Sequence, residues 1–303
     1  MKKKNKAIYL LFLMPFVYFA TACFVMWLVK TSGIYPSGSD TMYHVYRGDY
    51  VYNAIKSGNW YPLYDSAWYN GVEILRYWSP LPAYVMAFCQ YLAGGSQFGA
   101  YLFYIGGVCF LGACVWPFIG RGFNRPYLGA FIGLLWFFMP NNLCAIFIEG
   151  NLARSLSMIF LPVFIYSVYK YLYNHKLRYI PLMVFTFLLM ELCHLGYAGM
   201  VAIAVIIYGI VYLIQKGRKK AVLDVVISMI FGFMLLGIWL VASLRGGITS
   251  LDNSENMANF FQNLWITINP FERLTRGFEY FYFGFATLVV IVFGILFGYK
   301  KSR

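Results

Sequence analysis

The sequence is poor in charged residues, and above all in acidic ones. Only 12% of the 303 residues are charged and only 11 are Asp or Glu, whereas 61% are apolar. A typical soluble domain has roughly 25% charged and 45–50% apolar residues. A soluble fold of this length could not bury so much apolar surface, so lipid must replace water as the solvent for much of the chain.

The residues that most often bind metals are also few. Six cysteines lie within apolar segments and lack the paired spacing of a metal site, so we interpret them as small buried hydrophobic residues. The three histidines show no zinc-site spacing either. The sequence therefore predicts no zinc site built from Cys and His.

Long apolar segments dominate what is present. Those with roughly the length that crosses a membrane cover residues 7–29, 98–119, 127–147, 152–172, 179–194, 197–214, 221–244 and 280–298. The first segment lacks a convincing cleavage site, so we interpret it as an uncleaved transmembrane helix rather than a secretory signal. The predicted fold class is all-α, a polytopic transmembrane bundle of about eight to nine helices that forms a single membrane domain over 1–303.

Basic residues predict the orientation of these segments. The net charge of +13 could suggest a nucleic-acid partner, but most Lys and Arg form short clusters between apolar segments, so we expect no nucleic acid. Such clusters favour the cytoplasmic side, which predicts a multi-pass protein of the cell membrane with a cytoplasmic N-terminus. The clusters lie at 2–6, 121–125, 170–178, 216–220 and 300–303. The remaining connections, 30–79, 140–153, 194–197 and 245–279, are then external.

The shorter apolar segment 80–94 has to fit this orientation. Only one net crossing separates the external loop 30–79 from the internal cluster at 121–125, so 80–94 is predicted to be a re-entrant or slanted helix. The first external loop, 30–79, is long enough to hold juxtamembrane helices. In the second external segment, 245–279, the stretch NPFERLTRGFEY could contact a phosphate or lipid head group, although a solvated loop explains it as well.

The first external loop contains a candidate site. A helix is predicted to begin near Asp40, with Ser37 or Ser39 as its cap. Asp40, His44 and Arg47 follow at positions i, i+4 and i+7, which places them on one face of that helix. A carboxylate beside an imidazole can accept a proton from a hydroxyl group or bind a metal. An amphipathic surface helix in water is the alternative.

Further ionisable residues lie at the predicted external helix ends. Glu149 and Arg154 flank a turn between two spans and can form an ion pair that joins two helix ends. Glu191 and His194 are three residues apart, so they can pair with each other or face a cavity. The predicted orientation places Glu149, Arg154 and His194 on the same side of the membrane as Asp40 and His44.

The order of several short motifs carries a family resemblance. The motifs are DTMYH at 40–44, the helix that leads to Trp60, WYNG at 68–71, SPLP at 79–82, the Glu149…Arg154 turn and His194. In this order they resemble the GT-C superfamily of polytopic membrane glycosyltransferases. More narrowly, the chain resembles bacterial membrane proteins known as YfhO-like or 6-pyruvoyl-tetrahydropterin-synthase-related. The resemblance covers roughly residues 7–215.

The resemblance implies a transferase that takes a sugar from a polyprenyl-phosphate carrier and passes it to an acceptor on the extracytoplasmic face. Asp40 would be the base or a metal ligand, and His44 would orient it or contact the donor phosphate. The candidates for binding substrate and phosphate are Arg47, Glu149, Arg154 and His194. Transfer from a phospho-sugar requires a base for the acceptor and positive charge for the departing phosphate, which agrees with these residue types.

The sequence also departs from the superfamily pattern. Many members have an adjacent acidic pair, whereas here Thr41 follows Asp40, and Asp49 lies nine residues further on. A divalent metal held by Asp40 and Asp49 is therefore left open as a cofactor. The chain is also shorter than many members, which leaves room for a membrane partner subunit. The alternative functions are a transporter or flippase for a lipid-linked glycan and a non-catalytic scaffold of an envelope-polysaccharide complex.

Overall fold

The computed structural model describes residues 2–36, 38–68, 71–244 and 292. Within these residues all regular elements are helical, and the only pairing of extended backbone is an isolated bridge between Asp65 and Val72. The elements are α1 (Lys2–Ser32), α2 (Thr41–Lys56), α3 (Ile74–Tyr77), α4 (Leu81–Leu92), α5 (Gln97–Gly122), α6 (Pro126–Leu135), η1 (Trp136–Phe138), α7 (Pro140–Leu143), η2 (Cys144–Ile148), α8 (Leu152–Asn174), α9 (Tyr179–Cys193), α10 (Leu195–Lys216) and α11 (Lys219–Leu244). The predicted all-α class is confirmed.

Six helices in this part of the chain are long and apolar enough to cross a membrane. They are Phe12–Ser32, Gln97–Gly122, Pro126–Ile148, Leu152–Asn174, Leu195–Lys216 and Lys219–Ser243. Two apolar helices, α4 and α9, are shorter. The predicted span 280–298 and the second external segment 245–279 lie outside the described residues, apart from residue 292.

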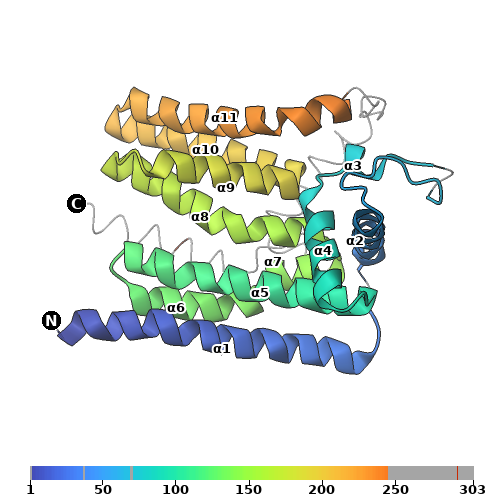
Figure 1. The fold of residues 1–303 in the computed structure, drawn as a ribbon. Helices are drawn as coiled ribbons and strands as arrows, with labels where there is room; N and C mark the ends of the chain where they lie inside the picture. Colours follow the sequence, from blue (N-terminus) through green and yellow to red (C-terminus); the bar gives the residue numbers. More distant parts are fainter. Residues whose placement is uncertain (1, 37, 69–70, 245–291, 293–303) are drawn as a thin grey trace.

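The long helices run side by side, and the short helices α2, α3, α4 and α7 gather at one end of the bundle, on the right of Figure 1. We call this end the site end. The start of α1 and the α5–α6, α8–α9 and α10–α11 connections lie at the opposite end. We call it the basic end because it holds the Lys and Arg clusters of the described residues, at 2–6, 121–125, 170–178 and 216–220. The predicted external connections 30–79, 140–153 and 194–197 all lie at the site end, so the predicted grouping of helix ends agrees with the structure.

Two side-chain hydrogen bonds join helices at the basic end. The Lys170 Nζ donates to the Gly122 carbonyl (2.5 Å), which joins α8 to the end of α5. The Tyr171 hydroxyl donates to the Asp224 carboxylate (2.5 Å), which joins α8 to α11. These bonds hold three helices together on the side away from the cavity described below.

The two short apolar helices have different roles. The 12 residues of α4 span about 18 Å, well below the ~30 Å hydrocarbon core. Both ends of α4 lie at the site end, between α3 and α5, so segment 80–94 does not cross the bundle, as predicted (Figure 1). The 15 residues of α9 span only about 22 Å, yet α9 runs between the two ends and packs on α8 and α11.

Buried tyrosines join the helices in the interior of the bundle. Tyr18 of α1 donates its hydroxyl to the Ala130 carbonyl of α6 (2.8 Å). Tyr104 of α5 donates to the Leu152 carbonyl at the start of α8 (2.8 Å). Both side chains are buried in one apolar cluster that draws on α1, α4, α5, α6 and α8. The hydrogen bond of Tyr104 therefore holds the first turn of α8 against α5.

The predicted orientation can be tested with two single cysteines in a cysteine-free background. The exposed Asn174 is the last residue of α8 at the basic end, and the exposed Ser57 directly follows α2 at the site end. In intact cells, a membrane-impermeant maleimide should label the Ser57→Cys variant and leave the Asn174→Cys variant unlabelled until the cells are permeabilised. Labelling of Asn174→Cys in intact cells would contradict a cytoplasmic basic end.

Candidate functional site

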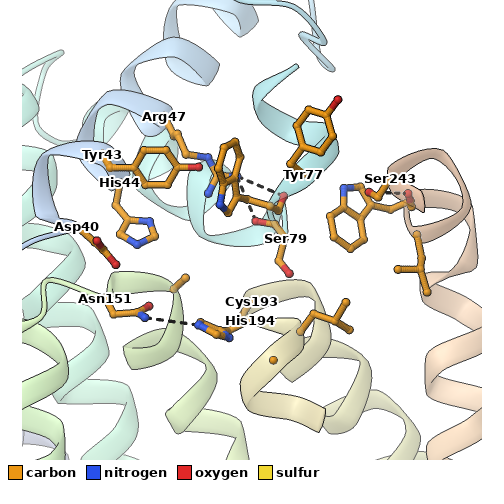
Figure 2. A pocket seen from close by; sticks show the side chains of 16 residues that line it. Asp40, Tyr43, His44, Arg47, Tyr77, Ser79, Asn151, Cys193, His194 and Ser243 are labelled. Atoms are coloured by element: carbon orange, nitrogen blue, oxygen red, sulfur yellow. Dashed lines mark hydrogen bonds between the residues drawn. The ribbon is translucent and has the colours of Figure 1, made fainter. Parts of the chain in front are cut away.

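A cavity of about 580 Å³ opens at the site end (Figure 2). Its volume lies within the range of roughly 300–1,000 Å³ that is usual for ligand pockets. Five parts of the chain line it: the start of α2, the segment from α3 to α4, the start of α8, the turn from α9 to α10, and the part of α11 at the site end. The lining residues are Asp40, Tyr43, His44, Arg47, Tyr77, Trp78, Ser79, Asn151, Ala153, Cys193, His194, Leu195, Gly196, Trp239, Leu240 and Ser243.

The predicted helix in the first external loop is α2. It ends at Lys56, and Asp40, His44 and Arg47 all line the cavity, which confirms the prediction that they share a face. The predicted serine cap is wrong: Asp40 itself occupies the N-cap position, and its side chain makes no capping hydrogen bond. The carboxylate of Asp40 therefore does not cap the helix that it precedes.

Backbone contacts place the start of α2 on the start of α8. The Asp40 N–H donates to the Glu149 carbonyl (3.0 Å), and the Ser39 hydroxyl reaches the same oxygen (3.0 Å). A Cβ atom on Gly38 would lie only 2.5 Å from the Gly150 Cα. Gly150 has φ +66°, a conformation that favours glycine. Two glycines thus allow the loop to cross directly over the entry to α8.

Arg47 is a buried cation at the cavity wall. Its side chain is 2% exposed, and its Cζ lies 5.3 Å from the Tyr43 ring centroid and 5.6 Å from that of Trp78. Its Nη2 donates to the Trp78 and Ser79 carbonyls (3.3 and 3.4 Å), while Nε has no hydrogen-bond partner in the described part of the chain. Burial lowers the pKa of Arg47. A buried cation held by rings and carbonyls favours an anionic ligand.

His44 lies one helical turn before Arg47 and is also buried. Burial lowers the pKa of His44 to about 3, with smaller electrostatic contributions from Arg47 and His194. The imidazole is therefore neutral at physiological pH. A neutral ring can accept or donate one hydrogen bond but is a weak base, which leaves the Asp40 carboxylate as the better proton acceptor of the two.

The other predicted ionisable residues are the two candidate pairs Glu149–Arg154 and Glu191–His194. Glu149 and Arg154 form the predicted ion pair (2.8 Å), and they lie beside the cavity without lining it. Glu191 and His194 do not pair. The Oε2 of Glu191 has no hydrogen-bond partner among the described residues, whereas the His194 Nδ1 accepts from the Tyr197 N–H (3.0 Å) and caps α10. His194 lines the cavity and Glu191 does not.

The residues of the predicted metal site do not come together. Asp49 lies nine residues after Asp40 on α2, half a turn out of phase, and its carboxylate accepts from Gln90 (2.6 Å) outside the cavity. Across the residues that the structure describes, no group of three or more His, Cys, Asp or Glu side chains could hold a metal ion. A metal shared by Asp40 and Asp49 does not fit this arrangement.

Some lining residues were not predicted from the sequence. Asn151 caps α8 by accepting from the Arg154 N–H (2.9 Å), and an Asn just before an apolar helix is a usual capping signal. Trp239 gives no such signal because it lies inside the apolar segment of α11. Its indole N–H donates to the Leu75 carbonyl (2.6 Å), which joins α11 to the residue before Arg76 in α3, and the side chain lines the cavity.

The contact between Gly38 and Gly150 can be tested by substitution. Gly150→Ala would place a Cβ 2.6 Å from the Thr41 N atom in a strained φ, so we expect a loss of about 1–3 kcal/mol in unfolding free energy. Gly217→Ala is the matched control, because Gly217 has φ +67° with nothing within 4 Å. Equal losses of thermal stability in the two variants would contradict a close contact at Gly150.

The low pKa of His44 predicts a pH dependence of stability. Below about pH 6.5 the unfolded chain binds a proton at His44 that the folded protein excludes, so stability falls as pH decreases toward 3. The slope from this group approaches about 1.4 kcal/mol per pH unit. In thermal unfolding between pH 7.5 and 4.5, the His44→Asn variant should lose less stability than the wild type. Parallel curves would contradict a buried neutral imidazole.

Comparison with known proteins identifies a family. A family model described as "6-pyruvoyl-tetrahydropterin synthase related domain; membrane protein" matches residues 75–303. The match begins after α2, so it covers Asn151 and His194 but not Asp40, His44 or Arg47. Comparisons with curated proteins and with solved structures give no match. Because the family model matches more than half of the chain, the protein belongs to the 6-pyruvoyl-tetrahydropterin synthase related family of membrane proteins.

Proposed function

We propose that the protein is a membrane glycosyltransferase that moves a sugar from a polyprenyl-phosphate carrier to an acceptor at the extracytoplasmic face. One observation carries the proposal. Asp40, His44 and Arg47 from the first loop share one cavity with His194, which lies about 150 residues further along the chain. This set combines a carboxylate, a buried cation and a second imidazole, which are the groups that such a transfer needs.

Each group has a role that its surroundings support. The partly exposed Asp40 carboxylate accepts the proton of the acceptor hydroxyl as that oxygen forms its bond to the anomeric carbon. The bond between the anomeric carbon and the carrier phosphate oxygen breaks, and both bonding electrons stay with the phosphate. Arg47 and His194 stabilise the negative charge of the departing polyprenyl phosphate. The Glu149–Arg154 ion pair supports the turn whose Glu149 carbonyl accepts from the Asp40 N–H.

A transporter or flippase remains the alternative from a different class, and it would need ionisable groups along a path through the bundle. Asp224 is engaged by Tyr171 at the basic end, and the lining residues gather at the site end. The described residues therefore favour a reaction site at one surface. A non-catalytic scaffold is the third hypothesis, and loss of Asp40 discriminates it from an enzyme.

The test is transfer of labelled sugar from polyprenyl-phosphate sugars in membranes that contain the full chain. Asp40→Asn removes the proton acceptor but keeps the size of the side chain, so transfer should fall by roughly 10²–10⁴-fold. Asp49→Asn is the matched control: it makes the same change on the same helix outside the cavity, and its Oδ1 can still accept from Gln90. Its activity should stay near that of the wild type.

Full activity of Asp40→Asn, with both variants expressed and folded alike, would remove the proposed base. Equal loss of activity in both variants would mean that α2 matters for stability rather than for proton transfer. A scaffold would tolerate both substitutions in a cellular assay of envelope-polymer assembly.

A further inference from the structure

The amide group of Asn151 has a fixed orientation. Its Oδ1 accepts a hydrogen bond from the backbone N–H of Arg154 (2.9 Å), and a backbone N–H can only donate. The amide oxygen therefore faces α8, and the NH₂ group faces the cavity and His194 (Figure 2). Asn151 thus presents a donor, not an acceptor, to this side.

The ring of His194 is fixed in the same way. Its Nδ1 lies 3.0 Å from the backbone N–H of Tyr197, so Nδ1 must be the acceptor and carries no proton. In the neutral ring the proton then sits on Nε2. The Nε2–H is the second donor that faces the cavity.

These two donors face each other without being able to bond. The Asn151 Nδ2 and the His194 Nε2 are 3.5 Å apart, and both carry hydrogen once their other contacts are satisfied. Neither atom has another hydrogen-bond partner in the described part of the chain, and Asp40 is not bonded to either of them. Two donors that face each other each need an acceptor, and one acceptor atom placed between them would satisfy both.

Arg47 shows independently which kind of acceptor the cavity favours. This guanidinium is almost fully buried at the same cavity, its Nε has no partner in the described residues, and no described carboxylate lies within ion-pair distance. The N-terminal ends of α8 and α10 also begin at this cavity and carry partial positive charge. Together these features favour an anionic oxygen over a neutral hydroxyl group.

We propose that Asn151 and His194 form a two-donor cradle for a phosphate oxygen, beside the buried Arg47. The inference deepens the proposed function and rests on it, because the phosphate would be that of the carrier lipid. It adds Asn151 as a binding residue with two bonds: its Oδ1 caps α8, and its NH₂ group holds the ligand. This dual role requires an amide, since Asp would keep the cap but lose the donor, and Ser would keep the cap with a shorter side chain that withdraws its hydroxyl from the ligand.

The test is direct binding to the purified full chain in nanodiscs, followed by tryptophan fluorescence, since Trp78 and Trp239 line the cavity. The probes are a polyprenyl monophosphate, the same polyprenol without phosphate, and inorganic phosphate. The wild type should bind the polyprenyl monophosphate at least tenfold more tightly than the polyprenol. Asn151→Asp keeps the cap but replaces a donor by a negative charge, so Kd should rise by roughly tenfold or more.

Two further variants and one control complete the design. His194→Asp can still cap α10 through a side-chain oxygen but carries no donor in place of the Nε2–H, so it should weaken binding to a similar extent. Asn151→Ser replaces Asn151→Asp if the latter does not fold. Asn141→Asp is the matched control, because Asn141 is exposed and does not line the cavity, so its Kd should not change.

The outcomes separate this inference from the proposed function. Unchanged binding in Asn151→Asp, or equal binding of polyprenol and polyprenyl monophosphate, would overturn the cradle even if transfer is observed. Binding of inorganic phosphate as tight as that of the lipid form, lost in Asn151→Asp, would support the cradle with free phosphate as its source. Asp40→Asn should still bind the lipid phosphate. Binding that depends on Asn151 in a protein without transferase activity would support the cradle and refute the reaction.

Discussion

The site depends on one close backbone contact, that of Gly38 with Gly150. Nothing larger than hydrogen fits between the first external loop and the entry to α8 at this point. The contact brings the Asp40 N–H within hydrogen-bond distance of the Glu149 carbonyl, and it sets the start of α2 beside the cap of α8. Residues separated by more than 100 positions in the sequence become neighbours because two positions have no side chain.

Around this contact the protein separates its polar groups into two kinds. At the basic end, Lys170 donates to a carbonyl at the end of a neighbouring helix, and Asp224 accepts from a tyrosine hydroxyl. At the site end, Arg47 and the donors of Asn151 and His194 are held by rings, carbonyls and helix caps, so they stay directed at a cavity. Unsatisfied polar groups are costly inside a protein, and they persist where a ligand completes them.

The sequence predicted the fold well because lipid imposes a strong pattern. Span lengths and basic clusters were enough to predict the helix ends that meet at the site and the failure of 80–94 to cross. The spacing of Asp40, His44 and Arg47 predicted their shared face, since helical periodicity is local. The same periodicity places Asp49 half a turn away from Asp40, so the sequence alone could have excluded a metal site shared by the two.

The contacts that the site residues make with other helices could not be predicted from the sequence. Glu191 and His194 have the spacing of a pair, yet His194 instead caps α10 and faces Asn151. Trp239 resembles any other residue of an apolar span, and only its hydrogen bond to α3 makes it part of the wall. The role of Asn151 depends on a histidine more than 40 positions away. Such choices are decided by packing between helices, which no local pattern records.

The turn between α9 and α10 has a consequence for the rim of the cavity. A single residue, His194, separates the last residue of α9 from the first residue of α10, and Cys193, His194 and Leu195 all line the cavity. A reversal this tight leaves no loop between the two helices. The rim at this position is therefore a pair of helix ends, and the residue that reverses the chain is the one that presents its ring to the cavity.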